Sequence, residues 1–360
     1  MRLAFIGSSL VSSYWNGAAT YYRGLLGALA RRGHAITFLE PDAFGRQQHR
    51  DIPDPEWARV VVWPADEAGM GRALETAAGH DVIVKASGVG VFDAELEGAV
   101  LSLRREGSIV AFWDVDAPAT LESVEKDPDN PFRGLVPRYD LVLTYGGGDP
   151  VVRAYERLGA RRCVPVYNAL DPATHHPVQP DPALDADLGF LGNRLPDREA
   201  RVEAFFLDAA RRLPERSFLL GGAGWEDKAL PANVRAIGHV PTARHNGFNC
   251  SGLAVLNVNR ASMARYGFSP PTRVFEAAGA GACLISDAWE GIETFLEPGR
   301  EVLVAQDGAK VAAHLAGLDR GRARAIGEAA RRRVLAHHTY EQRAALCEAV
   351  LEGRGREAAA

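Results

Sequence analysis

The chain has 360 residues, of which 47% are hydrophobic, so it can bury the cores of two α/β domains. Its formal net charge of −5 argues against a surface dedicated to nucleic acid or to an anionic membrane. No apolar run is long enough to span a bilayer, so we predict no integral membrane segment. The chain opens with a strand-like run, MRLAFIG, without the pattern of a signal peptide, and we therefore expect a cytoplasmic protein.

The first half of the chain alternates short apolar runs with helical stretches. The runs show no alternation of polar and apolar residues, which predicts strands buried on both faces of a parallel sheet. They are Leu3–Ile6, Ile36–Leu39, Val60–Trp63, Val82–Val84, Ile109–Trp113 and Leu141–Thr144. The first crossover helix is predicted over Asn16–Arg32, and Gly33 ends it.

The loop after the first predicted strand is a candidate binding loop, because parallel sheets bind ligands at the C-terminal ends of their strands. It contains Gly7, Ser8 and Ser9, and Gly17 opens the next helix. The spacing is not the G-x-G-x-x-G of dinucleotide-binding proteins, although Glu40 lies near the position of their acidic residue. A tight turn without a ligand explains these residues equally well.

Two carboxylates, Asp114 and Asp116, follow the predicted strand that ends at Trp113. At that end of a parallel sheet they are candidates for a general base that accepts a proton from a hydroxyl. The alternative is that one of them caps the next helix, and Asp116 before Ala117-Pro118 suits that position. We therefore expect Asp114 to act as the base and Asp116 as the cap.

A second set of strand-like runs begins after Tyr167–Pro182, a segment rich in Pro and Asp that predicts a linker between domains. The runs are Leu188–Leu191, Phe218–Leu220, Val234–Ile237, Leu253–Val258, Cys283–Ile285 and Val302–Val304. We therefore predict domains at residues 1–168 and 183–338, followed by an amphipathic helix at residues 339–352.

Metal chemistry has no support in the sequence pattern. The cysteines, at Cys163, Cys250, Cys283 and Cys347, are far apart and show no CxxC or zinc spacing. The ten histidines include no HExxH motif, and the pairs His175-His176 and His337-His338 are poor metal candidates. We predict reduced thiols and no metal site.

The segment Phe268–Val304 predicts a helix aimed at an anion. Ser269 can cap this helix, and Pro270-Pro271 stand where a missing N–H costs nothing. The positive end of the helix dipole beside Arg273 would attract a phosphate. Glu276, three residues further on, shares a face with Arg273 and suits ribose hydroxyls. Surface charges on an ordinary α/β helix remain the alternative.

This segment resembles the C-terminal signature of GT-B glycosyltransferases, and more closely their CgeB-like, spore-maturation branch. The shared positions are Phe268, Arg273, Phe275, Glu276, Ala277, Gly281, Asp287, Gly291, Phe295, Pro298, Gly299 and Glu301. In the superfamily, the carboxylate that aligns with Glu276 binds the ribose of the nucleotide sugar. Retaining members carry another Glu eight positions earlier, where this chain has Phe268.

The resemblance implies an α/β protein of the GT-B fold, with two Rossmann-like parallel-sheet domains that face a cleft. The N-terminal domain would bind the acceptor, the C-terminal domain would bind the nucleotide sugar, and the last helix would cross back to the N-terminal domain. It implies a hexosyltransferase that moves a sugar from a nucleotide-diphosphate sugar, with UDP as the expected nucleotide, and that needs no metal. The nucleotide sugar is a co-substrate rather than a cofactor, and its partner is an acceptor of unidentified chemistry.

The resemblance also assigns residues to each substrate. Gly7, Ser8, Ser9 and Gly17 would line the acceptor side. Donor contacts are implied for Gly192, Arg194, Gly222, Trp225, His239, Val240, Asn257, Arg260, Phe268, Ser269, Thr272, Arg273 and Glu276. Arg194 suits a phosphate as a bidentate donor, whereas Trp225 offers a stacking face or is a core residue. A sugar-nucleotide epimerase of the same fold and a non-catalytic sugar-nucleotide or carbohydrate-binding protein are the alternative functions.

Overall fold

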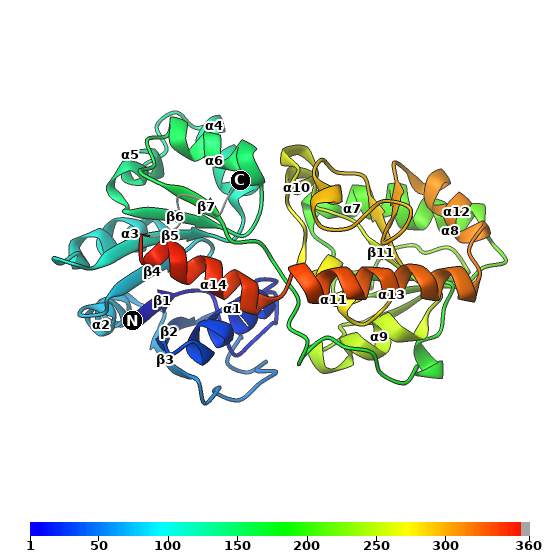
Figure 1. Ribbon diagram of the computed structural model, residues 1–360, viewed down its shortest axis with the longest axis horizontal. Helices are drawn as coiled ribbons and strands as arrows, with labels where there is room; N and C mark the ends of the chain where they lie inside the picture. Colours follow the sequence, from blue (N-terminus) through cyan, green and yellow to red (C-terminus); the bar gives the residue numbers. More distant parts are fainter. Residues whose placement is uncertain (354–360) are drawn as a thin grey trace. The chain divides into compact units, whose positions relative to one another are not determined.

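A computed structural model describes residues 1–353 of the chain. The contacts divide the chain into two compact units, Met1–Tyr167 together with the C-terminal helix from Tyr340, and Asn168–Thr339 (Figure 1). The predicted linker therefore belongs to the second unit from Asn168 onward. Its side chain explains why, since Asn168 Nδ2 donates to the carbonyl oxygen of Pro270 at 2.9 Å.

The first unit contains a parallel sheet of seven strands in the order β3-β2-β1-β4-β5-β6-β7. The strands are β1 Arg2–Ile6, β2 Ala35–Asp42, β3 Ala58–Pro64, β4 Val82–Ala86, β5 Ile109–Asp114, β6 Leu141–Thr144 and β7 Cys163–Pro165. Six of them match the apolar runs of the sequence. The seventh strand, β7, was not predicted, because it has only three residues and includes a proline.

The helices of the first unit are α1 Ala19–Arg31, α2 Glu67–Ala77, α3 Asp93–Ala99, α4 Ala117–Lys126, α5 Phe132–Leu135, α6 Gly148–Arg157 and α14 Tyr340–Leu351. Helix α1 begins later than predicted, so Gly17 precedes the helix rather than opening it. The side chain of Asn16 holds this stretch as a loop by donating to the carbonyl oxygens of Ser9 and Ser12. Helix α14 packs on α1, where a β-carbon at Gly24 would lie 2.1 Å from the Tyr340 ring (Figure 1).

The second unit contains a parallel sheet of six strands in the order β10-β9-β8-β11-β12-β13. The strands are β8 Leu188–Leu191, β9 Phe218–Gly221, β10 Val234–Gly238, β11 Ala254–Asn257, β12 Leu284–Asp287 and β13 Leu303–Ala305. Its helices are α7 Pro196–Val202, α8 Asp208–Arg212, α9 His245–Ser251, α10 Ala261–Tyr266, α11 Thr272–Gly279, α12 Gly308–Ala316 and α13 Arg320–His337. A π-helical stretch, Glu203–Leu207, joins α7 to α8.

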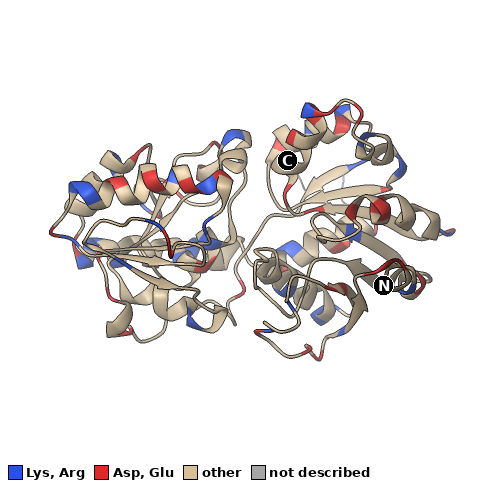
Figure 2. Cartoon of the chain, turned by 180° about the vertical axis from the view of Figure 1, so that it is seen from behind, with Lys and Arg blue, Asp and Glu red and all other residues tan. Residues whose placement is uncertain are grey.

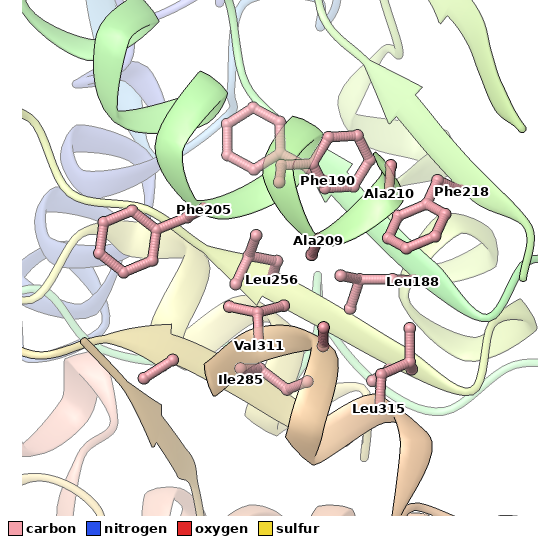
Figure 3. Packing of buried hydrophobic residues seen from close by; sticks show 14 of the residues in the cluster. Leu188, Phe190, Phe205, Ala209, Ala210, Phe218, Leu256, Ile285, Val311 and Leu315 are labelled. Carbon is pink, nitrogen blue, oxygen red and sulfur yellow. The ribbon is translucent and has the colours of Figure 1, made fainter. Parts of the chain in front are cut away.

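The core of the second unit is formed by its sheet together with residues of α7, the π-helical stretch, α8, α12 and α13 (Figure 3). Leu188, Leu256 and Ile285 come from three neighbouring strands, and Phe206 and Val311 come from the helices above them. All five are at most 2% exposed. Burial of the strands on both faces is the pattern expected of a parallel sheet, and it makes the sheet a rigid support for the loops that follow each strand.

Positive and negative residues are interspersed along the surface helices of both units (Figure 2). This distribution agrees with the small net charge of −5. Within residues 1–353, no helix combines the length and the apolar character that a membrane span requires.

Candidate functional site

The loops that follow β8 and β11 mark the point where the strand order of the second sheet reverses. Open parallel sheets bind ligands beside such a switch point, at the carboxyl ends of the strands. The residues predicted to contact the donor lie at the ends of β8, β9, β10 and β11, in the segments that follow these strands, or on α11. Some of these residues hold the loops in place, and others are available to a ligand.

Trp225 belongs to the part that fixes the loops. Its side chain is 2% exposed, lies in the hydrophobic core and donates from Nε1 to the carbonyl oxygen of Gly192 at 2.9 Å. Gly222 has a φ of +124°, and a β-carbon there would lie 2.1 Å from the same oxygen of Gly192. The glycines therefore let the loops after β8 and β9 touch, and Trp225 has the core position that was the alternative to a stacking face.

Arg194 is held by two carboxylates. Its guanidinium lies 2.8 Å from Glu199 and 2.6 Å from Asp227. The hydrogen bond to Glu199 raises the pKa of Arg194 further above its ordinary value. A phosphate at this position would have to compete with both carboxylates.

Asn257 lies in a buried polar network at the carboxyl ends of β11 and β12. Its Nδ2 donates to Asn259 Oδ1 at 2.9 Å and to Ser286 Oγ at 3.1 Å. Asp287 accepts from the backbone N–H of Asn259 at 3.1 Å and from Arg201 at 2.6 Å. Burial raises the pKa of Asp287, while Arg201 opposes that rise. This network fixes the loop after β11, and no spacing in the sequence indicates that Arg201 is part of it.

Two further residues that were predicted to contact the donor sugar nucleotide lie at the ends of this loop. Arg260, which directly precedes α10, lies 2.6 Å from Asp197 of α7. Phe268 has a φ of +44°, and its ring occupies the space where Gly291 would carry a β-carbon. The loop after β11 is thus tied to α7 at one end and to the loop after β12 at the other.

The start of α11 differs from the prediction for Ser269. The N-cap residue is Pro271, with a φ of −70° and a ψ of 160°, and no side chain caps the helix. Ser269 Oγ instead donates to the carbonyl oxygen of Gly267 at 2.9 Å, because both prolines precede the first helical residue, Thr272. The prediction that Ser269 caps this helix is therefore wrong. The uncapped N-terminus keeps its backbone N–H groups available to an anion.

Arg273 and Glu276 form a buried ion pair on α11. Arg273 Nη1 lies 3.4 Å from Glu276 Oε2, and the side chains are 13% and 4% exposed. His175 Nε2 and His245 Nδ1 lie 4.0 and 3.9 Å from the two oxygens of Glu276. Among the described residues, Arg273 Nε, Glu276 Oε2 and these two imidazole nitrogens have no hydrogen-bond partner.

The ionisation of this cluster follows from its burial and its charges. Burial acts to raise the pKa of Glu276, but His175, Arg273 and His245 outweigh it and lower that pKa to about 2. Burial, helped by Arg273, lowers the pKa of His245 to about 4, and burial likewise lowers the pKa of His175. At neutral pH the cluster therefore holds one cation, one anion and two uncharged imidazoles.

A metal ion is the second chemistry that this cluster suggests. His175, His245 and Glu276 each offer a ligand atom, and these atoms lie within 4.8 Å of one another. Zinc bonds of about 2.0–2.1 Å would require the atoms to move closer together than the observed 3.9 and 4.0 Å. The guanidinium of Arg273 beside the carboxylate also opposes a cation. Neither histidine was identified as a site residue, because one lies in the predicted linker and the other begins α9.

His239 and Val240 directly follow β10. His239 is exposed, whereas Val240 is buried and its carbonyl oxygen lies 3.2 Å from His245 Nε2. The backbone predicted to meet the base of a nucleotide is thus linked to the cluster around Glu276.

In the first unit, Asp114 ends β5 with no exposed surface. Its carboxylate accepts hydrogen bonds from Tyr155 Oη at 2.5 Å, from Ser87 Oγ at 2.8 Å, and from Thr120 Oγ1 and the backbone N–H of Asp116 at 3.0 Å. Burial raises the pKa of Asp114 in spite of these bonds. This arrangement suits a residue that holds loops together.

Asp116 is the N-cap residue of α4 and is partly exposed as a residue, although its Oδ1 atom is buried. Its carboxylate makes no capping hydrogen bond to the helix. Asp116 thus lies at the predicted N-cap position but does not cap through its side chain, and the burial of Asp114 does not favour its predicted role as the base.

The serines of the predicted acceptor loop are also engaged. Ser8 Oγ donates to Asn16 Oδ1 at 2.9 Å, and Ser9 Oγ donates to Glu40 at 3.0 Å. Gly7 lies so close to the ring of Phe38 that a β-carbon would approach it to 2.6 Å. Gly17 is exposed and has open space around it. These residues shape the loop, and Glu40 serves the same loop rather than a ribose.

Comparison with known proteins agrees with the architecture. Residues 198–349 match the protein family described as glycosyl transferase-like. No curated protein sequence matches the chain. Sucrose-phosphate synthase from Thermosynechococcus elongatus has a TM-score of 0.71 at 15% identity, over 98% of each chain. Anabaena HepE in complex with UDP and glucose has a TM-score of 0.69 at 14% identity, over 98% of this chain and 100% of that one. An alpha-glucosyltransferase in complex with UDP-glucose and DNA has a TM-score of 0.72 at 12% identity, over 98% and 99%. The chain therefore has the GT-B fold.

Proposed function

We propose that the protein is a metal-independent glycosyltransferase that transfers a hexose from a nucleotide-diphosphate sugar to an acceptor hydroxyl. The observation that carries the proposal is the buried pair of Arg273 and Glu276 behind the uncapped N-terminus of α11. The match of residues 198–349 to a glycosyl transferase-like family supports it, as does the fold shared with HepE, which binds UDP and glucose. From the residues shared over Phe268–Val304 we further propose that the chain is related to the CgeB-like branch.

The donor diphosphate would lie at the N-terminus of α11. The helix dipole and the free backbone N–H groups there favour an anion, and Arg273 adds a full positive charge. These groups stabilise the leaving diphosphate in the transition state, which is the task of a metal ion in other transferases. Glu276 would accept hydrogen bonds from the ribose hydroxyls, and the backbone near His239 would meet the base.

In the transfer itself, the acceptor oxygen forms a bond to the anomeric carbon while the bond from that carbon to the diphosphate breaks. The nucleoside diphosphate leaves with the electron pair, and the acceptor proton passes to a base. We assign the base to Asp116, because this residue is partly exposed, whereas Asp114 is completely buried and its carboxylate accepts from four donors. A general base must come within hydrogen-bond reach of the proton that it accepts.

Calorimetry with UDP, GDP, TDP and CDP tests the donor site, and we expect UDP to bind. Arg273→Ala should weaken UDP binding by about 1.5–3 kcal/mol, the range for a charged hydrogen bond, and should affect uridine much less. Arg324→Ala, which removes an arginine whose side chain is 82% exposed on α13, is the matched control. Equal losses for UDP and uridine would reject the phosphate role of Arg273.

Product analysis after incubation with UDP-sugars separates the classes of function. Transfer to an added acceptor supports the proposal. Interconversion of the donor sugar would identify an epimerase, and tight binding without turnover would identify a sugar-nucleotide-binding protein.

A further inference from the structure

Among residues 1–353, few non-glycine residues have a positive φ, and all of them are aromatic. They are Trp15 at 48°, Phe44 at 55°, Phe92 at 53° and Phe268 at 44°. Bulky side chains rarely adopt this backbone conformation, and it persists only where the surrounding structure enforces it. Such residues gather at binding and active sites, so three of them in one unit call for a physical reason.

Trp15, Phe44 and Phe92 follow three adjacent strands of the first sheet. Trp15 comes after β1, Phe44 after β2 and Phe92 after β4, and the sheet order is β2-β1-β4. All three loops therefore leave the carboxyl edge of the sheet. The strand order reverses between β1 and β4, which is the point where open parallel sheets bind ligands.

Separate sets of contacts hold each of these loops. Asn16 bonds to the carbonyl oxygens of Ser9 and Ser12 beside Trp15, and the Tyr14 ring stacks on His49 at 4.0 Å. On the loop after β4, Asp93 accepts hydrogen bonds from the backbone N–H groups of Val89 and Gly90 at 3.0 and 2.8 Å. It also pairs at 2.5 Å with Lys85, which is completely buried.

Phe44 is tied to the loop after β4. Gly90 has a φ of +102°, and a β-carbon there would lie 2.7 Å from the Phe44 ring. Below the ring, the guanidinium carbon of Arg46 lies 5.0 Å from the ring centre. Arg46 Nη1 donates at 3.3 Å to the carbonyl oxygens of Ser8 and Val89, and so joins the loops after β1 and β4. These contacts therefore hold the loops, and with them the Phe44 ring, in one arrangement.

The rings nevertheless remain open to solvent. Phe44 is 57% exposed and Trp15 is 45% exposed, and Phe92 is only partly buried. Large aromatic residues normally contribute to folding by being buried, so strained loops that present them to water bring little stability. Beside them, Arg46 Nε is buried and has no hydrogen-bond partner among the described residues.

We propose that Trp15, Phe44 and Phe92 form the ring-binding part of the acceptor site. The acceptor is then a molecule with a flat ring that has an apolar face and carries hydroxyl groups, as sugar rings and phenolic rings do. Its apolar face stacks on the aromatic rings, and its hydroxyl groups meet the polar groups around Arg46. This inference deepens the proposed function and rests on it.

Saturation-transfer NMR on the full chain tests the inference with methyl glucoside as the sugar ring and phenol as the aromatic ring. Trp15→Ala and Phe44→Ala should each weaken binding of one of these probes by roughly three- to tenfold, the size of an aromatic contact. The probe that loses affinity identifies the ring class. Val62→Ala, at a 40% exposed residue of β3, is the control and should leave both affinities unchanged. The proposal is overturned if neither probe binds the wild type, or if both variants behave as the control does.

A second measurement separates a binding role from a structural one. Trp15→Gly and Phe44→Gly remove the ring and also relieve the positive φ. If the rings serve a ligand, thermal unfolding of these variants should occur at the same or a higher temperature than in the wild type. A clear fall would show that the rings are structural and would overturn the proposal. UDP affinity, measured on the same samples, reports on the donor site of the second unit. If UDP does not bind, the result counts against the proposed function and not against the site formed by the aromatic rings.

Discussion

Arg273 and Glu276 pair one turn apart on α11, with Nη1 of the arginine 3.4 Å from Oε2 of the glutamate. Both residues are also our candidates for recognising the donor. Because neither charge is exposed by more than 13% of its side chain, the pair affects folding as well as binding. A variant of either residue therefore requires a stability measurement beside the binding measurement.

We expect Glu276→Gln to destabilise the fold by about 3–5 kcal/mol, because it leaves the buried guanidinium of Arg273 without a counter-charge. Arg273→Met should do the same to Glu276. The double variant should be destabilised by clearly less than the sum of the two. Urea unfolding of the four proteins measures this coupling.

The pair Glu297 and Arg300 provides the control for this cycle. It has the same spacing of three residues in the same unit, but its side chains are 47% and 69% exposed at a separation of 3.0 Å. Its coupling should be about 0.2–1 kcal/mol, which is typical of exposed pairs. Equal couplings for the two pairs would contradict the electrostatic role that we give to Arg273 and Glu276.

The cluster around Glu276 also predicts how stability depends on pH. Burial lowers the pKa of His245 from 6.5 to about 4, so between these pH values His245 is protonated in the unfolded chain but not in the folded one. Stability should therefore fall as the pH drops from about 6.5 towards 4, by at most about 1.4 kcal/mol per pH unit for this group. The lowered pKa of His175 acts in the same direction.

Glu276 contributes in a more acidic window. Its pKa falls from 4.5 to about 2, so its stabilising effect is complete above pH 4.5 and is lost as the pH falls towards 2.

Urea unfolding between pH 7 and 4 should show a smaller loss of stability in His245→Gln than in the wild type. The exposed His239→Gln serves as the control and should follow the wild-type curve. Identical slopes in all three proteins would exclude a buried, uncharged His245.

Much of the fold could be predicted from the sequence because burial on both faces leaves a simple mark in a strand. Runs such as Leu141–Thr144 and Leu188–Leu191 match β6 and β8 residue for residue. Helix starts were harder, because side-chain contacts decide them. Asn16 holds the chain before α1 in a loop, and the two prolines delay α11 beyond Ser269.

The candidate site could be predicted only where its residues are close in sequence. Arg273 and Glu276 are three apart on one helix, so their proximity follows from helical geometry. His175 and His245 reach the same carboxylate from distant segments, and no spacing in the sequence indicates this. The aromatic residues after β1, β2 and β4 were not predicted as site residues, for a related reason. Their positive φ angles arise from contacts between loops rather than from a local motif.

We expect turnover to persist in EDTA, because Arg273 and the N-terminus of α11 supply the positive charge that the leaving diphosphate requires. Assays with and without EDTA, on protein dialysed beforehand, measure this. Loss of turnover that zinc restores would instead identify His175, His245 and Glu276 as a metal centre. In that case His175→Ala should prevent the restoration, whereas His176→Ala, its exposed neighbour, should allow it.

The last prediction concerns the two carboxylates after β5. Asp114→Asn can keep the oxygen that accepts from Ser87 and Thr120, but it replaces the one that accepts from Tyr155 by an NH2 group, so about 1–3 kcal/mol of stability should be lost for this buried group left unsatisfied. Asp116→Asn should change stability by only about 0.5 kcal/mol, since it lies at an N-cap position that Asn tolerates well.

Turnover should respond in the opposite order. If Asp116 is the base, Asp116→Asn should lower kcat by roughly 10²–10⁴-fold while UDP affinity stays unchanged, because the base acts only in the transition state. Asp114→Asn should lose activity only in proportion to the folded fraction. A folded but inactive Asp114→Asn beside an active Asp116→Asn would return the role to Asp114. Since a buried carboxylate cannot reach an acceptor proton without an opening of the loops that it holds, that result would also require these loops to move during turnover.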